Sequence, residues 1–175
     1  MPDFNRNHFE LFHLPVAFGI DSQALEQAYR DVQAEVHPDR FAHAGEAEQR
    51  LAMQWATQVN EAYQTLKLPF ERARYLLGLH GVNALDPNNT VMPADFLMQQ
   101  MEWREQLAEA SDRLDVHALD RLEQDLRAMA QRLERELADQ IDGRQDYTTA
   151  AETLRKFRFM EKLLHDIQDA YEEIV

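Results

Sequence analysis

The chain has 175 residues, a formal net charge of −14 and no cysteine, which excludes disulfides, thiolate metal sites and cysteine nucleophiles. Its acidic balance argues against nucleic acid and anionic membranes as partners, because both attract clustered lysine and arginine. Only 5 glycines and 6 prolines interrupt a chain rich in strong helix formers, and this composition predicts an all-α protein.

Acidic side chains are concentrated in the C-terminal half. Residues 1–80 carry 7 basic and 11 acidic side chains, whereas residues 81–175 carry 11 and 21. We therefore expect a basic or mixed-charge protein partner to meet the C-terminal half. No apolar run approaches the roughly 20 residues of a membrane span, and the segment from Met1 to Arg6 has no apolar signal core. These features predict a cytoplasmic protein.

The first predicted elements are a short helix over residues 8–12 and a longer helix that ends before Pro38. Asp21 suits the N-cap of the longer helix, and proline stops it because its ring clashes with the preceding turn. The apolar residues of this helix, between Asp21 and Pro38, keep the three-and-four spacing of one buried face. They are Leu25, Ala28, Tyr29, Val32 and Val36.

A further helix is predicted over residues 46–66. Because it matches the preceding helix in length and follows it after about ten residues, the two are expected to pack as an antiparallel hairpin. Another helical stretch covers residues 70–79, and Gly81 closes it at a C-terminal stop position. These elements form the first predicted domain, residues 1–81, and residues 82–93 form a linker.

The second predicted domain, residues 94–175, is an antiparallel three-helix bundle. Its helices are expected over about residues 95–110, from Asp115 to near Gly143, and from Thr149 onward, where Glu152 would complete a capping box. Two apolar stripes mark the buried faces of the second and third of these helices. They are Leu119, Leu122, Leu126, Met129, Leu133 and Leu137, and then Phe157, Met160, Leu164, Ile167, Tyr171 and Ile174.

The connection between the first two long helices contains His37-Pro38-Asp39, which we expect to lie on the surface. His37 could act as a general base oriented by Asp39, although no serine or cysteine nucleophile lies nearby and side chains flanking a proline are expected to point apart. His37, Asp39 and His43 could bind a metal, but one loop as the only source of ligands is a weak site. A loop without a role and a surface recognised by another protein are the remaining interpretations.

Several stretches resemble a known family. A helix, a His-Pro-Asp connection and an antiparallel helix within the first 80 residues resemble a J-domain, and the stretch NEAYQTL at residues 60–66 resembles the end of its third helix. The whole chain is similar to the HscB family of J-proteins, through stretches near Pro69, Phe96 and Leu154. They read PFERARYLL at residues 69–77, FLM at residues 96–98 and LRKFRF at residues 154–159.

This resemblance implies a co-chaperone of iron–sulfur cluster biogenesis that brings the scaffold protein IscU to the chaperone HscA and stimulates its ATPase. The residues that would contact the chaperone are His37, Pro38, Asp39, Arg30 and Arg40. Arg40 stands where lysine is commoner, which keeps the charge but changes the geometry of the donor groups.

The helix over residues 95–110 has two apolar faces. At about 100° per residue, Phe96, Trp103 and Ala110 share one face, and Leu97 shares another with Met98 and Met101. A bundle helix needs one such face, so the second either widens packing or forms an exposed patch for a partner. The resemblance favours the patch and implies a scaffold-binding surface. Replacing Leu97, Met98 and Phe159 by alanine is expected to weaken scaffold binding and to leave the fold intact. The residues of this surface are Leu97, Met98, Met101, Glu102, Glu105 and Phe159.

The predicted function is therefore that of an adaptor between an HscA-type chaperone and an IscU-type scaffold. We expect a monomer that is not an enzyme, holds no metal or cofactor and binds neither nucleic acid nor membrane. Two rival functions remain open: a general J-domain co-chaperone with a different client, and a small metal-dependent hydrolase.

Overall fold

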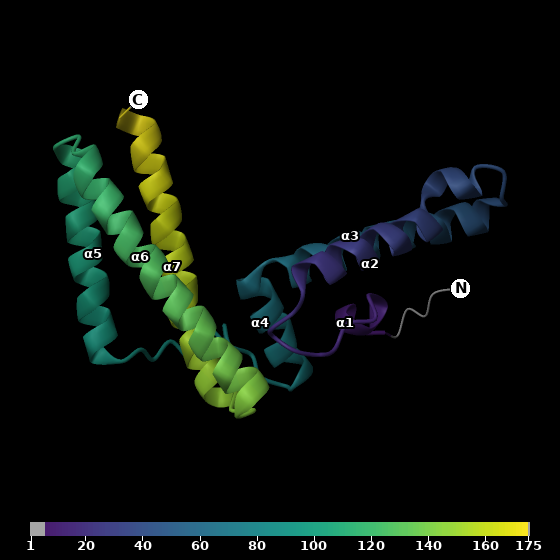
Figure 1. The fold of residues 1–175 in the computed structure, drawn as a ribbon, viewed down its shortest axis with the longest axis horizontal. Helices are drawn as coiled ribbons and strands as arrows, with labels where there is room; N and C mark the ends of the chain where they lie inside the picture. Colours follow the sequence, from purple (N-terminus) through teal and green to yellow (C-terminus); the bar gives the residue numbers. More distant parts are fainter. Residues whose placement is uncertain (1–5, 175) are drawn as a thin grey trace. The chain divides into compact units, whose positions relative to one another are not determined.

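A computed structural model describes residues 6–174, so residues 1–5, which include most of the segment considered for a signal sequence, lie outside it. Every regular element in the described range is helical (Figure 1), which confirms the predicted all-α class. The elements are α1 (His8–Leu11), α2 (Ser22–Val36), the 3₁₀ helix η1 (Pro38–Phe41), α3 (Glu46–Lys67), α4 (Pro69–Leu79), α5 (Ala94–Asp112), α6 (Val116–Ala138), the π-helix η2 (Asp139–Gly143) and α7 (Tyr147–Ile174).

The residues form two compact units, each with most of its contacts inside itself. One unit ends at Leu76 and the other begins at Leu77. The division lies inside α4, before the domain limit predicted at residue 81. Over the described residues, no helix is both long enough and apolar enough to cross a membrane.

The first unit is built on the predicted hairpin of α2 and α3, which run antiparallel (Figure 1). Asp21 caps α2 as predicted, because its carboxylate accepts the backbone N–H groups of Gln23 and Ala24 at 2.9 and 3.2 Å. Tyr29 of α2 stacks on Tyr63 of α3 with ring centroids 4.1 Å apart. The core of this unit is apolar and almost fully enclosed. Its members include Phe9, Phe12, Phe18, Leu25, Trp55, Val59, Ala62 and Leu66.

A buried arginine joins three segments of the first unit. Arg72 of α4 is only 8% exposed, and its guanidinium donates to the backbone carbonyls of Phe18 and Leu66 at 2.6 and 2.7 Å. The same group lies over the Phe18 ring, 4.9 Å from its centroid. These contacts compensate for burying a charge, so Arg72 positions the start of α4 against the end of α3.

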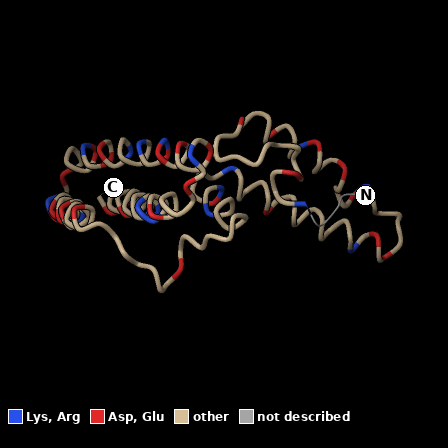
Figure 2. Tube along the Cα trace, turned by 90° about the horizontal axis from the view of Figure 1, so that it is seen from below, with Lys and Arg blue, Asp and Glu red and all other residues tan. Residues whose placement is uncertain are grey.

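The second unit is the predicted bundle, in which α6 packs against both α5 and α7. Acidic and basic residues are interspersed along its long helices (Figure 2). The stripe predicted on α6 is buried, except that Met129 is half-buried. On α7 the predicted residues Leu164, Tyr171 and Ile174 are half-buried, and the fully buried residue next to Leu164 is Leu163, which is 1% exposed. Both positions fit a three-and-four spacing after Met160, so periodicity alone does not separate them.

The start of α7 also differs from the prediction. The helix begins at Tyr147, and Asp146 caps it: one carboxylate oxygen accepts the Thr149 backbone N–H at 3.1 Å, and the other accepts the Thr149 hydroxyl at 2.7 Å. These hydrogen bonds to Thr149 lower the pKa of Asp146. Thr149 therefore lies inside the first turn, because an aspartate three residues earlier satisfies the free backbone donor.

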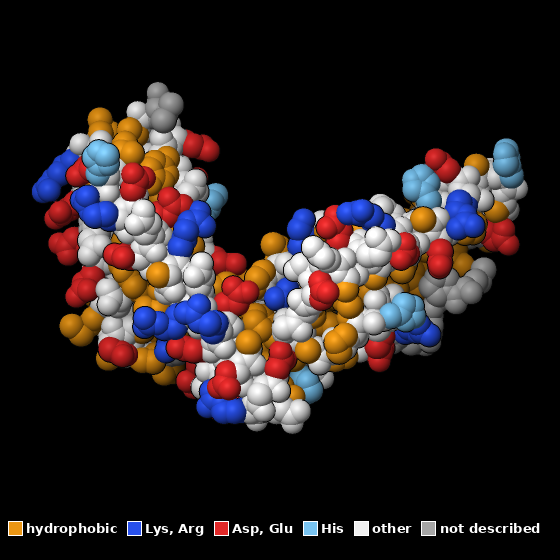
Figure 3. Space-filling model, viewed as in Figure 1, with side chains coloured by type: hydrophobic (Ala, Val, Ile, Leu, Met, Phe, Trp, Pro, Cys, Tyr) orange, Lys and Arg blue, Asp and Glu red, His pale blue; other side chains and the backbone are white. Residues whose placement is uncertain are grey.

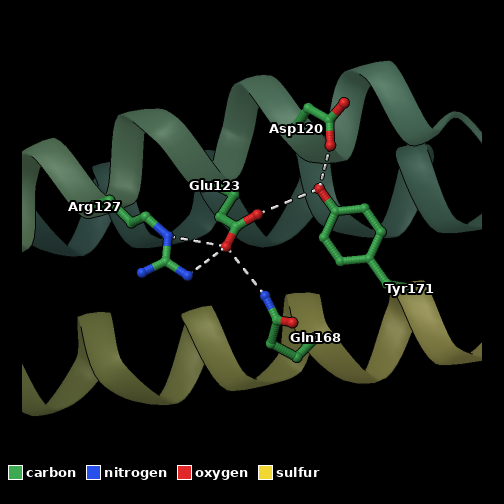
Figure 4. A network of polar contacts seen from close by, with 5 residues as sticks. All are labelled: Asp120, Glu123, Arg127, Gln168 and Tyr171. Carbon is green, nitrogen blue, oxygen red and sulfur yellow. Dashed lines mark hydrogen bonds and ion pairs between the residues drawn. The ribbon is translucent and has the colours of Figure 1, made fainter.

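A polar network joins α6 to α7 (Figure 4). The Tyr171 hydroxyl donates to Asp120 Oδ1 at 2.6 Å and lies 3.4 Å from Glu123 Oε2. Glu123 Oε1 in turn accepts from Arg127 Nε at 2.9 Å and from Gln168 Nε2 at 3.1 Å. Burial and the two carboxylate acceptors raise the pKa of Tyr171. Tyr171 therefore remains protonated and acts as a donor between the two helices.

Candidate interaction sites

The His-Pro-Asp motif lies at the connection between α2 and α3. His37 follows the last residue of α2 in extended backbone, and Pro38 opens η1 at a position where its missing N–H is harmless. His37, Pro38, Asp39 and Arg40 are all exposed. The surface position predicted for the motif is confirmed.

The His37 and Asp39 side chains lie together, contrary to the prediction that they point apart. His37 Nδ1 accepts the backbone N–H of Asp39 at 3.3 Å and lies 3.6 Å from Asp39 Oδ2. The tight 3₁₀ turn that begins at Pro38 brings residue 39 back toward the imidazole. Because Nδ1 is the acceptor, a neutral imidazole carries its proton on Nε2.

The two arginines predicted to contact a chaperone also have partners within the chain. Arg40 Nη1 donates to the carbonyl of Ala34 at 3.2 Å, which satisfies one of the free carbonyls in the last turn of α2. Arg30 forms an ion pair with Glu26, one turn earlier on the same helix. Arg40 therefore has a positioning role that the sequence pattern did not indicate: it holds the motif against the end of α2.

No group of three or more His, Cys, Asp or Glu residues within the described part of the chain is close enough together to hold a metal ion. His37, Asp39 and His43 are therefore not brought together as a three-residue ligand set.

Helix α5 has the two faces expected from its sequence. Phe96, Trp103 and Ala110 are 9%, 6% and 3% exposed and face the bundle. The other apolar residues do not widen the core, because their exposed fractions are 45% for Leu97, 64% for Met98 and 71% for Met101. We call Leu97, Met98 and Met101 the apolar trio.

Charged side chains lie close to the apolar trio along α5. Glu102 and Glu105 are both exposed, and Glu102 accepts from Gln99 Nε2 at 3.1 Å. In Figure 3, hydrophobic side chains are visible at the N-terminal end of α5, beside acidic side chains along its outer edge. An apolar centre with a charged rim is the usual anatomy of a protein interface.

Phe159 joins α7 to α5 and is half-buried. Its ring meets Phe96 edge-on, with centroids 6.1 Å apart and planes at 82°. Two cation–π contacts also join these helices. Arg104 of α5 lies 5.3 Å from the centroid of the Phe159 ring, and Lys156 of α7 lies 5.6 Å from the centroid of the Phe96 ring. Sequence reasoning did not single out these cations, because pairing between two helices has no local signal.

The first unit has an exposed His-Pro-Asp turn at the end of an antiparallel hairpin, and a separate helical bundle follows it in the sequence. These features define a J-domain protein with a second domain. A family model described as the HSCB C-terminal oligomerisation domain matches residues 92–168. The "Co-chaperone protein HscB homolog" of Aromatoleum aromaticum is 49% identical over 98% of this chain and 97% of its own length. The protein of the same name from Burkholderia multivorans is 50% identical over 95% of each chain.

Solved structures give the same result. "Chaperone HscB from Vibrio cholerae" is 36% identical with a TM-score of 0.85 and covers 97% of this chain and 100% of its own. The human co-chaperone protein HscB is 30% identical with a TM-score of 0.87 over 95% of this chain and 83% of its own. The chain belongs to the HscB co-chaperone family.

Proposed function

We propose that this protein is an adaptor rather than an enzyme. Its first unit stimulates the ATPase of an HscA-type chaperone, and its second unit delivers an IscU-type scaffold to that chaperone during iron–sulfur cluster assembly. The observation that supports this function best is the presence of two exposed recognition surfaces on two separate compact units: His37-Pro38-Asp39 on the first and the apolar trio on the second. Membership of the HscB co-chaperone family supports it independently.

The first surface suits binding better than catalysis. The His37 and Asp39 side chains are 52% and 90% exposed and lie at the end of a helical hairpin. A general base is effective when it lies next to a nucleophile, or a single bound water, in a site that is closed to bulk solvent. An exposed imidazole N–H beside a carboxylate instead offers one donor and one acceptor in a fixed pair, which is what a partner surface can recognise.

The second surface suits a partner with an apolar patch and basic residues around it. Methionine side chains adapt to the contour of a partner, and Leu97 provides a stiffer apolar anchor beside them. Glu102 and Glu105 beside them would attract basic residues and exclude acidic ones.

The test is the ATPase rate of purified chaperones with this protein, in the presence and absence of scaffold. We expect stimulation of the HscA-type chaperone and a further, more than additive increase when scaffold is added. Stimulation of a general chaperone alone, with no effect of scaffold, would favour a general J-protein with another client. Hydrolytic activity that needs added metal and no chaperone would favour the hydrolase.

A further inference from the structure

We propose that Met98 and Met101 make the second surface sensitive to oxidants: conversion of these thioethers to sulfoxides would release the scaffold. The inference rests on the proposed function of the apolar trio and adds a modification site to it. The added property is the susceptibility of the two thioethers to oxidation, which scaffold binding by itself does not require.

Both sulfur atoms of the apolar trio are open to solvent. Met98 and Met101 are 64% and 71% exposed, whereas Met160 in the bundle core is 0% exposed. They lie three residues apart on α5, so their side chains are neighbours on one face of the helix. The chain has no cysteine, so thioethers are its only sulfur groups. An oxidant in solution therefore reaches sulfur where the partner is proposed to bind, and also at the exposed Met53 of the first unit.

The chemistry balances with hydrogen peroxide as the oxidant. The methionine sulfur attacks one peroxide oxygen, and the O–O bond breaks. That oxygen stays on sulfur as the sulfoxide, and the other leaves as water together with both peroxide hydrogens. Sulfur is oxidised by two electrons and peroxide is reduced by two. The product is a polar, chiral group in place of a flexible apolar one.

The carboxylates next to the two methionines cannot compensate for that polarity. Glu102 lies one helical turn after Met98, and Glu105 one turn after Met101. Ionised carboxylates only accept hydrogen bonds and so cannot donate to a sulfoxide oxygen. Arg104, three residues after Met101, already has its guanidinium over the Phe159 ring. A sulfoxide oxygen that an apolar partner surface covers without offering a donor is costly in an interface.

The experiment compares scaffold binding by calorimetry before and after peroxide treatment, with sulfoxides assigned by peptide mass mapping. The variant carrying M98L and M101L keeps an apolar face that cannot be oxidised. M53L is the matched control, because Met53 is 62% exposed but lies on α3 of the first unit.

We expect oxidised wild type and oxidised M53L to lose affinity by about tenfold or more, a difference of about 1.4 kcal/mol. The M98L/M101L variant should keep its own untreated affinity after treatment, because leucine has no sulfur to oxidise. Unchanged affinity of a wild type with sulfoxides at both positions would overturn the inference, as would an equal loss in the M98L/M101L variant. Failure of untreated wild type to bind would instead overturn the proposed function, and the inference with it.

Discussion

Phe159 of α7 packs edge-on against Phe96 of α5, with ring centroids 6.1 Å apart. Phe96 lies in α5 directly before Leu97 and Met98, so this contact holds the segment that carries the proposed anchors. The sequence suggested that Phe159 could be replaced by alanine without cost to the fold. Its half-buried position and its contacts with Phe96 and Arg104 lead us to expect such a cost.

Replacing Phe159 by alanine should therefore weaken both scaffold binding and the bundle. Removing a half-buried ring between two helices should lower the free energy of unfolding by about 2 kcal/mol, somewhat less than for a fully buried phenylalanine. Urea unfolding and calorimetric titration with scaffold measure the two effects. The matched control is Leu97→Ala with Met98→Ala, which should weaken binding by about tenfold or more and change the unfolding free energy by less than about 0.5 kcal/mol. Unchanged affinity of this control would contradict the proposed surface.

Substituting His37 by glutamine should abolish stimulation of the chaperone ATPase and leave scaffold affinity unchanged. The glutamine side chain cannot keep both the acceptor for the Asp39 N–H and a donor at the position of Nε2. Because the motif and the apolar trio lie on separate units, the second surface should not change. Steady-state ATPase assays and calorimetry on the same preparation test this. Loss of both activities in a folded variant would count against the two-site account.

Tyr171→Phe should destabilise the bundle without affecting either proposed activity. The substitution removes the donor that joins Asp120 of α6 to α7 and leaves the ring in place. A hydrogen bond to a carboxylate at a partly exposed site contributes about 1 kcal/mol. Urea unfolding should show that loss, while scaffold affinity stays at the wild-type value. An unfolding free energy equal to that of wild type would show that the Tyr171 hydroxyl in Figure 4 contributes nothing to stability.

The stability of the first unit should depend on the charge of His8. This side chain stacks on Tyr75 with ring centroids 4.1 Å apart, and burial lowers the pKa of His8 below its ordinary value of 6.5, with Glu61 opposing part of the shift. The unfolded chain then binds the proton more readily than the folded chain. The contribution to stability is therefore complete above the ordinary pKa and is lost as the pH falls through the lowered one.

Urea unfolding at a series of pH values measures this dependence, and His8→Phe is the control because it keeps an aromatic ring that does not titrate. Wild type should lose more stability than the control as the pH falls below about 6.5. Parallel curves for the two proteins would contradict the role assigned to His8.

Sequence predicted most of the secondary structure but only part of the sites. Helix limits set by a strong local signal were correct, as at Asp21, whose side chain caps α2. At Thr149 two capping residues competed, and the nearer aspartate at 146 formed the cap. The exposed apolar trio was predictable because helical periodicity separates it from the buried face. The contacts of Arg72 and Arg104 join segments distant in the chain, so no local pattern indicates them.

The central claim is that one chain carries both activities and couples them. The most direct test uses His37→Gln, which should bind scaffold only, and the Leu97→Ala/Met98→Ala variant, which should act on the chaperone only. With scaffold below saturation, wild type should raise the HscA-type ATPase rate more than additively, and an equimolar mixture of the two variants should give no more than the sum of its separate effects. A mixture that restores the full wild-type rate would contradict delivery by a single adaptor.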